Sequence, residues 1–109
     1  MKIAIVGSKG VTVSEIGKYL CECDEIVSGG AMGVDACATE YAKRNDIKLT
    51  EFLPKYEQYG RVAPIVRNKK IVDYADKIIV FWDCSSKGSL SVIKYAEKTG
   101  KPCKVIICN

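Results

Sequence analysis

The chain has 109 residues, 48% of them hydrophobic and 28% charged, which suits a single domain with one sizeable core. Its 17 Lys and Arg residues against 13 Asp and Glu residues give a net charge of +4, which is compatible with anionic ligands. The sequence contains no histidine, which excludes a Ser-His-Asp triad, a Cys-His dyad and any His-ligated metal site.

No apolar run approaches the roughly 20 residues that span a bilayer, and the opening MKIAIVG is too short for a signal peptide. We therefore expect a cytoplasmic protein with no membrane partner. The six cysteines form no C-x-x-C pair, and we interpret them as small buried hydrophobic residues in a reducing compartment. We expect no cofactor and no metal. The cysteines are Cys21, Cys23, Cys37, Cys84, Cys103 and Cys108.

Strand and helix patterns alternate along the whole chain. Short apolar runs predict strands, and apolar residues at helical spacing predict helices between them. In chain order these are a strand over 2–7, a helix over 12–23 capped by Thr12 or Ser14, a strand over 25–29, a helix over 34–44, a strand over 47–54, a surface loop over 55–64, a helix over 65–76, a strand over 77–82, a helix over 86–100 and a strand over 104–108.

This order predicts a parallel five-stranded sheet with helices on both faces, so we expect a single doubly wound α/β domain over residues 1–109. Within it, Ile65 is expected on the apolar edge of the third helix. Leu90, Ile93 and Ala96 are expected to face inward on the fourth, which Gly100 and Pro102 end.

Small polar and glycine residues follow three of the predicted strands, as GSKG (7–10), SGGAMGVD (28–35) and DCSSKGS (83–89). The carboxyl ends of parallel strands share one edge of the sheet, where helix N-termini favour anions. Gly29 and Gly30 would let the backbone approach an anion, and Gly33 would let the next helix start close to the sheet. A tight turn without ligand is the alternative, but three such segments at one edge favour a phosphate-bearing ligand. Neither G-x-G-x-x-G nor a Walker A pattern is present.

Arg67 and Asn68 begin the helix before the strand at 77–82. Arginine suits bidentate contact with phosphate and asparagine suits a sugar or base edge, although both residues could also belong to a solvated helix face. Lys9 and Lys87 allow the same two interpretations.

Asp35 could cap the glycine-led helix or accept from a ribose hydroxyl. Asp83 is the remaining carboxylate placed for chemistry, its alternative being a helix cap. Tyr56, Tyr59 and Trp82 could stack on a base or simply fill space.

Four segments in this order resemble the SLOG superfamily: GSKG, SGGAMGVDACATEYA (28–42), PIVRNKKIVDYADKIIVFWD (64–83) and SKGSLSVIKYAEKTGKP (86–102). This group includes the DNA-processing protein Smf/DprA, the LOG-type cytokinin phosphoribohydrolases and small YspA-like proteins. The likeness covers nearly the whole chain and is greatest to the stand-alone YspA-like branch.

The resemblance implies a Rossmann-like domain that binds nucleotides, nucleotide-derived molecules or nucleic acid. It maps the glycine-rich sites onto Gly7, Ser8, Ser28, Gly29, Gly30, Gly33 and Asp35, and the later phosphate-binding turn onto Ser86, Gly88 and Ser89, with Arg67 and Asn68 alongside. In LOG-type enzymes a glutamate assists cleavage of the N-glycosidic bond. Val92 stands at that position here, and a valine cannot act as a base.

We therefore expect a binding or sensing module for a nucleotide-like ligand, as a homodimer or higher homo-oligomer. One alternative is an N-glycosidase or related hydrolase that uses Asp83 or Asp35 in place of the missing glutamate. The other is DprA-like binding of single-stranded DNA, which the modest net charge makes less favoured.

Overall fold

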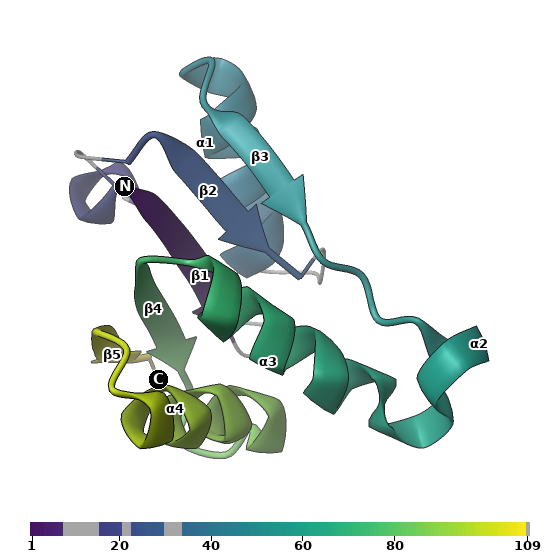
Figure 1. The fold of residues 1–109 in the computed structure, drawn as a ribbon. Coiled ribbons are helices and arrows are strands. Elements are labelled where there is room, and N and C mark those ends of the chain that lie inside the picture. The colour runs from purple at the N-terminus through teal and green to yellow at the C-terminus, as the bar shows by residue number, and fades with distance from the viewer. Residues whose placement is uncertain (8–15, 21–22, 30–33, 109) are drawn as a thin grey trace.

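The computed structural model describes residues 1–7, 16–20, 23–29 and 34–108, the first two residues of the last range by their backbone alone. Their five strands form one parallel sheet in the order β3-β2-β1-β4-β5, as Figure 1 shows. The strands are β1 (Lys2–Gly7), β2 (Glu25–Ser28), β3 (Lys48–Glu51), β4 (Lys77–Trp82) and β5 (Cys103–Ile107).

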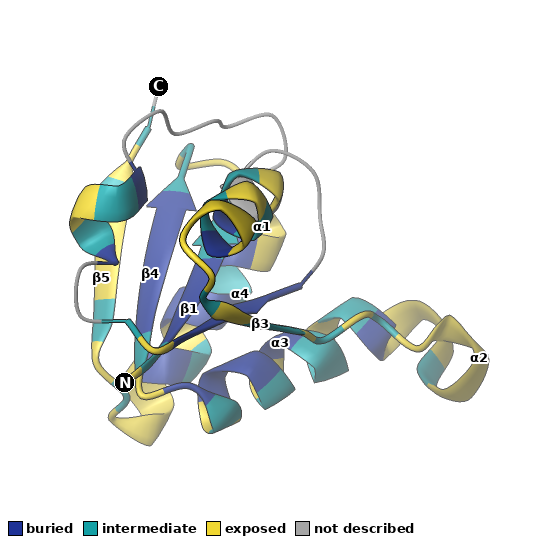
Figure 2. Ribbon diagram, turned by 90° about the horizontal axis from the view of Figure 1, so that it is seen from above, coloured by how far each residue is buried: buried dark blue, intermediate teal, exposed yellow. Residues whose placement is uncertain are grey.

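The described helices are η1 (Ile16–Tyr19), α1 (Val34–Arg44), α2 (Tyr56–Tyr59), η2 (Gly60–Val62), α3 (Ala63–Tyr74) and α4 (Lys87–Thr99). Helix α1 packs against one face of the sheet, whereas α3 and α4 lie together on the other (Figures 1 and 2). The predicted α/β class, with a parallel sheet and helices on both faces, is therefore confirmed. No helix in the described ranges has the length and apolar content needed to cross a membrane.

Two apolar clusters, one on each side of the sheet, make up the core. Alternate residues of the central strands supply them: Ile3 and Ile5 face α1 and η1, and Ala4 faces α3 and α4. Strands buried on both faces are typically continuous apolar runs, as KIAIVG and KIIVFW are. Each large aliphatic side chain that is fully buried contributes about 1.5–3 kcal/mol to stability.

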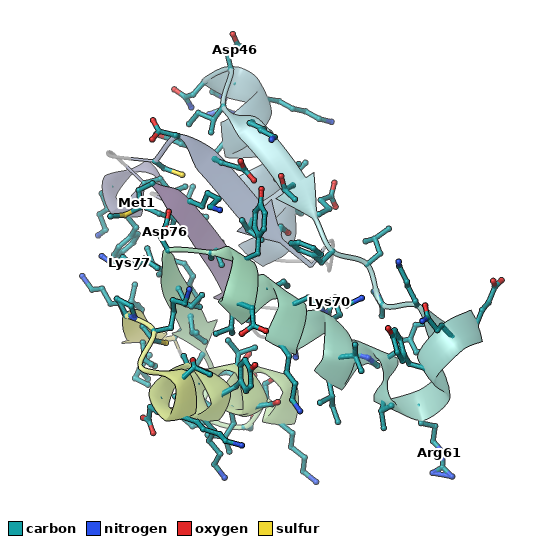
Figure 3. The ribbon with its side chains drawn as sticks, viewed as in Figure 1. Met1, Asp46, Arg61, Lys70, Asp76 and Lys77 are labelled. Carbon is teal, nitrogen blue, oxygen red and sulfur yellow. The ribbon has the colours of Figure 1, made fainter. Side chains whose placement is uncertain are left out.

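Most predicted elements lie close to the expected bounds, but β3 ends at Glu51, three residues before the predicted end of that strand, and the segment 55–64 does not form the predicted loop. It forms α2 and η2 and then enters α3 at Ala63, with Pro64 in the first turn, where the missing N–H of proline is tolerated. Neither α2 nor η2 contains a buried residue. The two short helices project from the body as an arm (Figure 2), and Arg61 points outward from its tip (Figure 3).

Three side chains that we expected to be buried are exposed or only half-buried. Ile65 is 46% exposed on α3. Leu90 is only half-buried on α4, where Ser89, Val92, Ile93 and Ala96 are the buried positions. The apolar face of α4 is thus rotated from the one we expected. Cys84 is exposed, and the five described cysteines are free thiols. Of the helix expected over 12–23, η1 is described, and the caps Thr12 and Ser14 lie outside the described residues.

The carboxylate of Glu25 is buried and ties together the first residues of β2, the strand β3 and the last turn of α3. Its Oε2 accepts hydrogen bonds from Tyr74 Oη at 2.5 Å and Thr50 Oγ1 at 2.7 Å. Lys48 Nζ lies 3.5 Å from Oε1. These donors, the Tyr74 hydroxyl foremost, lower the pKa of Glu25 from its ordinary value. The cluster stabilises the packing of α3 against β2 and β3 near the amino ends of the strands. Ligand sites in this fold form at the opposite edge of the sheet, at the carboxyl ends of the strands.

Candidate functional site

Arg67 contacts the carboxyl end of β2 from the second turn of α3. Its Nη1 donates to the carbonyl oxygen of Gly29 at 2.9 Å, and its Nε donates to Asn68 Oδ1 at 2.7 Å. Asn68 is buried, and so is Ser28, the last residue of β2. Two hydrogen bonds hold the guanidinium in a fixed orientation, so little side-chain entropy remains to be lost when a ligand binds.

Gly29 is a glycine because the side chain of Arg67 lies against it. A Cβ atom at residue 29 would lie 2.6 Å from Arg67 Nη1 and 3.1 Å from Cζ. Both distances are below ordinary van der Waals contact. The sequence interpretation assigned this glycine to the approach of an anion, and the group that approaches in the structure is the guanidinium that would bind such an anion. Gly29 thus serves the site by making room for Arg67.

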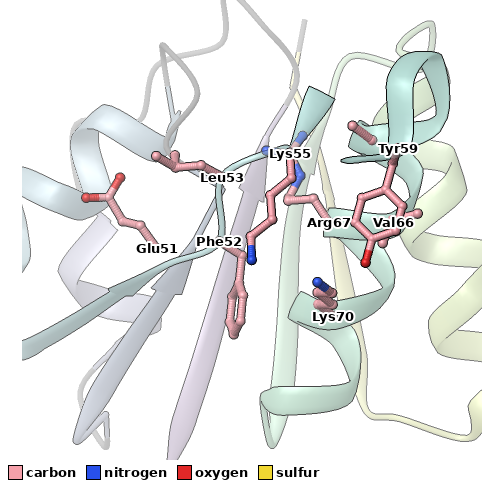
Figure 4. A pocket seen from close by; sticks show the side chains of 9 residues that line it. Glu51, Phe52, Leu53, Lys55, Tyr59, Val66, Arg67 and Lys70 are labelled. Carbon is pink, nitrogen blue, oxygen red and sulfur yellow. The ribbon is translucent and has the colours of Figure 1, made fainter. Parts of the chain in front are cut away.

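A pocket of ≈ 250 Å³ opens beside Arg67, between the end of β3 and the first half of α3. Its cationic side chains come from two segments: Lys55 from the link after β3, and Arg67 and Lys70 from α3. In Figure 4 the ammonium groups of Lys55 and Lys70 and the phenol of Tyr59 point toward the same space. Lys70 Nζ lies 5.4 Å from the centre of the Tyr59 ring.

The remaining lining residues are Glu51, Phe52, Leu53, Ala63 and Val66. The carboxylate of Glu51 points away from the pocket in Figure 4, and the other three charged residues of the lining are cations. The field in the pocket is therefore positive, and Phe52 and Tyr59 give it aromatic walls. Chemically, the pocket can bind an anion that carries a flat or apolar part.

The turn after β4 is held by its own polar groups. Asp83 Oδ1 accepts from the backbone N–H groups of Ser85 and Ser86, each at 2.9 Å. Ser86 caps α4, its Oγ accepting from Ser89 N at 3.3 Å, and Trp82 Nε1 donates to Ser86 O at 3.1 Å. Asp83 thus shapes the turn that presents the N-terminus of α4, and its part in catalysis stays a prediction.

The structure divides the predicted site residues among three places. Ser28, Gly29, Arg67 and Asn68 meet at the end of β2. Asp83, Ser86, Gly88 and Ser89 follow β4, whereas Gly7 ends β1 between these two strands. Lys87, the first residue of α4, borders a groove between α3 and α4. Ser8, Lys9, Gly30, Gly33 and the side chain of Asp35 lie outside the described residues.

Sequence reasoning missed Lys55 and Lys70 as site residues. Lys70 stands three residues after Arg67, so a helix places both side chains on one face. Lys55 follows Pro54, just after the end of a predicted strand. Ligand sites in this fold form at the carboxyl ends of the strands. The sequence therefore offered a reason to consider each lysine separately. That the two lysines lie in one pocket depends on the packing of the segment after β3 against α3.

Together, the parallel sheet, the two helical layers and the pocket at the carboxyl ends define a Rossmann-like α/β domain with a pocket lined by three cationic side chains. Comparisons with protein-family models, with curated proteins and with solved structures find no match.

Proposed function

We infer that the protein binds a nucleotide or nucleotide-derived ligand, with the phosphate held by Lys55, Arg67 and Lys70. The observation that carries this proposal is the convergence of these three cations, from two segments, on one pocket at the carboxyl edge of the sheet. Phosphate suits the site because arginine can bind two of its oxygens at once and the lysines add further positive charge.

The size and walls of the pocket narrow the ligand class. At ≈ 250 Å³ the pocket lies just below the range of about 300–1,000 Å³ typical of small-molecule sites, which favours a mononucleotide over a dinucleotide. The rings of Tyr59 and Phe52 offer apolar surface on which a base can rest. The missing G-x-G-x-x-G pattern agrees with this choice.

Binding is favoured over cleavage of the N-glycosidic bond. Val92, which takes the place of the LOG-type glutamate, is fully buried in the core under α4, so a carboxylate at this position would not meet a ligand. Asp83 Oδ1 accepts hydrogen bonds from two backbone N–H groups of its own turn, and these bonds fix the direction of the carboxylate. We therefore expect no release of base from nucleoside monophosphates.

A thermal-shift comparison of AMP, adenosine, ribose 5-phosphate and inorganic phosphate tests the proposal. A ligand that binds only the folded state raises Tm by mass action, so AMP should raise it and adenosine should not. Lys70→Ala should weaken AMP binding about tenfold, as loss of one charged hydrogen bond does. Lys43→Ala removes the same charge from an exposed position on α1 and should leave binding unchanged.

The proposal fails if no phosphate-bearing compound shifts Tm, or if Lys43→Ala weakens binding as much as Lys70→Ala. Both lysines are outside the core, so the variants should fold, and unfolding curves without ligand verify this. Incubation of the AMP complex followed by chromatography of the free base separates a binding protein from a hydrolase.

A further inference from the structure

Positive charge gathers on the two helices that lie next to each other on one face of the sheet, α3 and α4 (Figure 1). Together they contain six Lys and Arg residues and two Asp and Glu residues. Their net charge of +4 equals that of the whole chain, so the rest of the protein is neutral on balance. A partner of negative charge would therefore be attracted to this side of the molecule.

A groove of ≈ 400 Å³ runs between α3 and α4. Among the described residues that line it, the charged ones are all lysines, and each of these is exposed. Lys87, Lys94 and Lys98 are separated by seven and four residues, so they share one face of α4 over roughly 16 Å of helix. Lys69 stands across the groove on α3. The groove thus carries a row of cations rather than a scatter.

The same groove also offers aliphatic and aromatic surface. Leu90 and Tyr95 lie among the lysines, and both are half-buried. Each lysine adds the methylene groups of its stem, which can lie along apolar groups while the ammonium stays in water. A ligand that uses the whole groove must therefore carry negative charges beside an apolar surface.

Tyr95 is held in place and leaves little of its ring free. Its hydroxyl donates to Asp73 Oδ1 at 3.0 Å and lies 3.2 Å from Oδ2. Lys69 Nζ lies over the ring, 5.7 Å from its centre. The cation thus occupies a face on which a base would stack, and Leu90 offers nothing to a phosphate. These two features favour a polypeptide over a nucleic acid.

We propose that this groove is the docking surface for an acidic amphipathic helix of a protein partner. A helix laid along two neighbouring helices can pack against both, and carboxylates beside its apolar stripe would meet the lysines while the stripe meets Leu90 and the lysine stems. A second copy of this chain fits less well, because none of the three long helices that the structure describes, α1, α3 and α4, has a net negative charge. The groove shares no residue with the Arg67 pocket, so the proposal does not depend on nucleotide binding.

Fluorescence anisotropy with a labelled, designed peptide tests this proposal. The probe has about 18 residues, enough to form a helix and to span the groove, and its leucines form one stripe flanked by glutamates. The control peptide has the same composition with the leucines moved off the stripe, so it keeps the charge and loses the apolar face. At about 50 mM salt the striped peptide should bind at least about tenfold more tightly than the control peptide, and added salt should weaken its binding.

Substitutions in the groove should weaken binding of the striped peptide. Lys94→Ala/Lys98→Ala should do so at least about tenfold, through the loss of two charged contacts. Leu90→Gln should do so about threefold, through the loss of an apolar contact. Lys43→Ala/Lys104→Ala removes the same charge from exposed positions on α1 and β5 and should bind like the wild type. All five side chains lie outside the core, so the variants should fold, and melting curves verify this.

The proposal is overturned if the striped peptide does not bind, if the control peptide binds equally tightly, if Leu90→Gln has no effect, or if the control pair of substitutions weakens binding as much as Lys94→Ala/Lys98→Ala. It is overturned in favour of a nucleic acid if an oligothymidylate of equal charge binds the groove more tightly than the striped peptide. Lys94→Ala/Lys98→Ala should leave the rise of Tm with AMP unchanged, so this proposal and the nucleotide proposal fail separately.

Discussion

Replacing Gly29 by alanine should dislodge Arg67. The new Cβ would stand 2.6 Å from Arg67 Nη1, and the three nearest atoms around it all belong to this one side chain. The far end of an arginine can move, so the fold should survive. The guanidinium would have to give up its 2.9 Å hydrogen bond to the carbonyl oxygen of Gly29 and leave the pocket wall.

The size of the effect follows from that bond. A hydrogen bond from a charged donor contributes about 1.5–3 kcal/mol, and because Arg67 is only half-buried the displaced group regains water. We expect Gly29→Ala to lower the free energy of unfolding by about 1–2 kcal/mol. In an Arg67→Ala background the clash is gone. The φ of Gly29 lies outside the left-handed region, so the same change should be neutral or stabilising by about 0.4–1 kcal/mol.

A double-mutant cycle by urea unfolding measures this reversal. The expected coupling between the two positions is about 2 kcal/mol, well above the roughly 0.3–0.5 kcal/mol within which independent sites add. Titration with AMP should show the same pattern, each single variant weakening binding and the double variant weakening it no further than Arg67→Ala. Equal costs of Gly29→Ala in both backgrounds would refute the assignment of this glycine to Arg67.

Three further changes test the stability of the fold that carries the site. Tyr74→Phe should cost about 2 kcal/mol at pH 7. Because the pKa of Glu25 is lowered in the fold, its stabilisation is present above its unfolded pKa of about 4.3 and is lost as pH falls through the folded value. Urea unfolding at low pH should thus bring the variant close to the wild type, and an undiminished gap there would contradict this account. Ser86→Ala should cost about 1 kcal/mol by removing the cap of α4, whereas Ser91→Ala within the helix should be neutral or stabilising by a few tenths, because alanine is the better helix former. Gly100→Ala should cost about 1 kcal/mol, since φ is +74° at this C-cap, and Gly100→Asn should cost less in the same unfolding assay.

The fold could be predicted from local patterns because most elements bury a periodic face. The runs KIAIVG and KIIVFW gave the bounds of β1 and β4, and the spacing after Val34 gave α1. Helix α2 gave no such pattern, since it has four residues and buries none of them. Its polar composition and the nearby Gly60 and Pro64 therefore indicated a loop.

The site was harder to predict because its parts depend on tertiary packing. Arg67 and the edge of the sheet where it lies followed from residue chemistry and topology. That Lys55 would lie across from Lys70 depends on how the segment after β3 packs on α3, which no local rule gives. The sequence also could not show that Lys87 points into a different groove from Arg67, because that depends on the rotation of α4 against the sheet.

The order of the strands has a kinetic consequence. Strand β1, at the start of the chain, is central and pairs with β4, so Ile3 finds its partner Lys77 only across most of the molecule. The first three strands are synthesised before α3 and α4, whose side chains bury Ala4 and Val27 on one face of the sheet. Such long-range pairing slows folding and leaves the nascent chain open to aggregation. A fragment ending near residue 62 should therefore remain unfolded, because it lacks β4, α3 and α4.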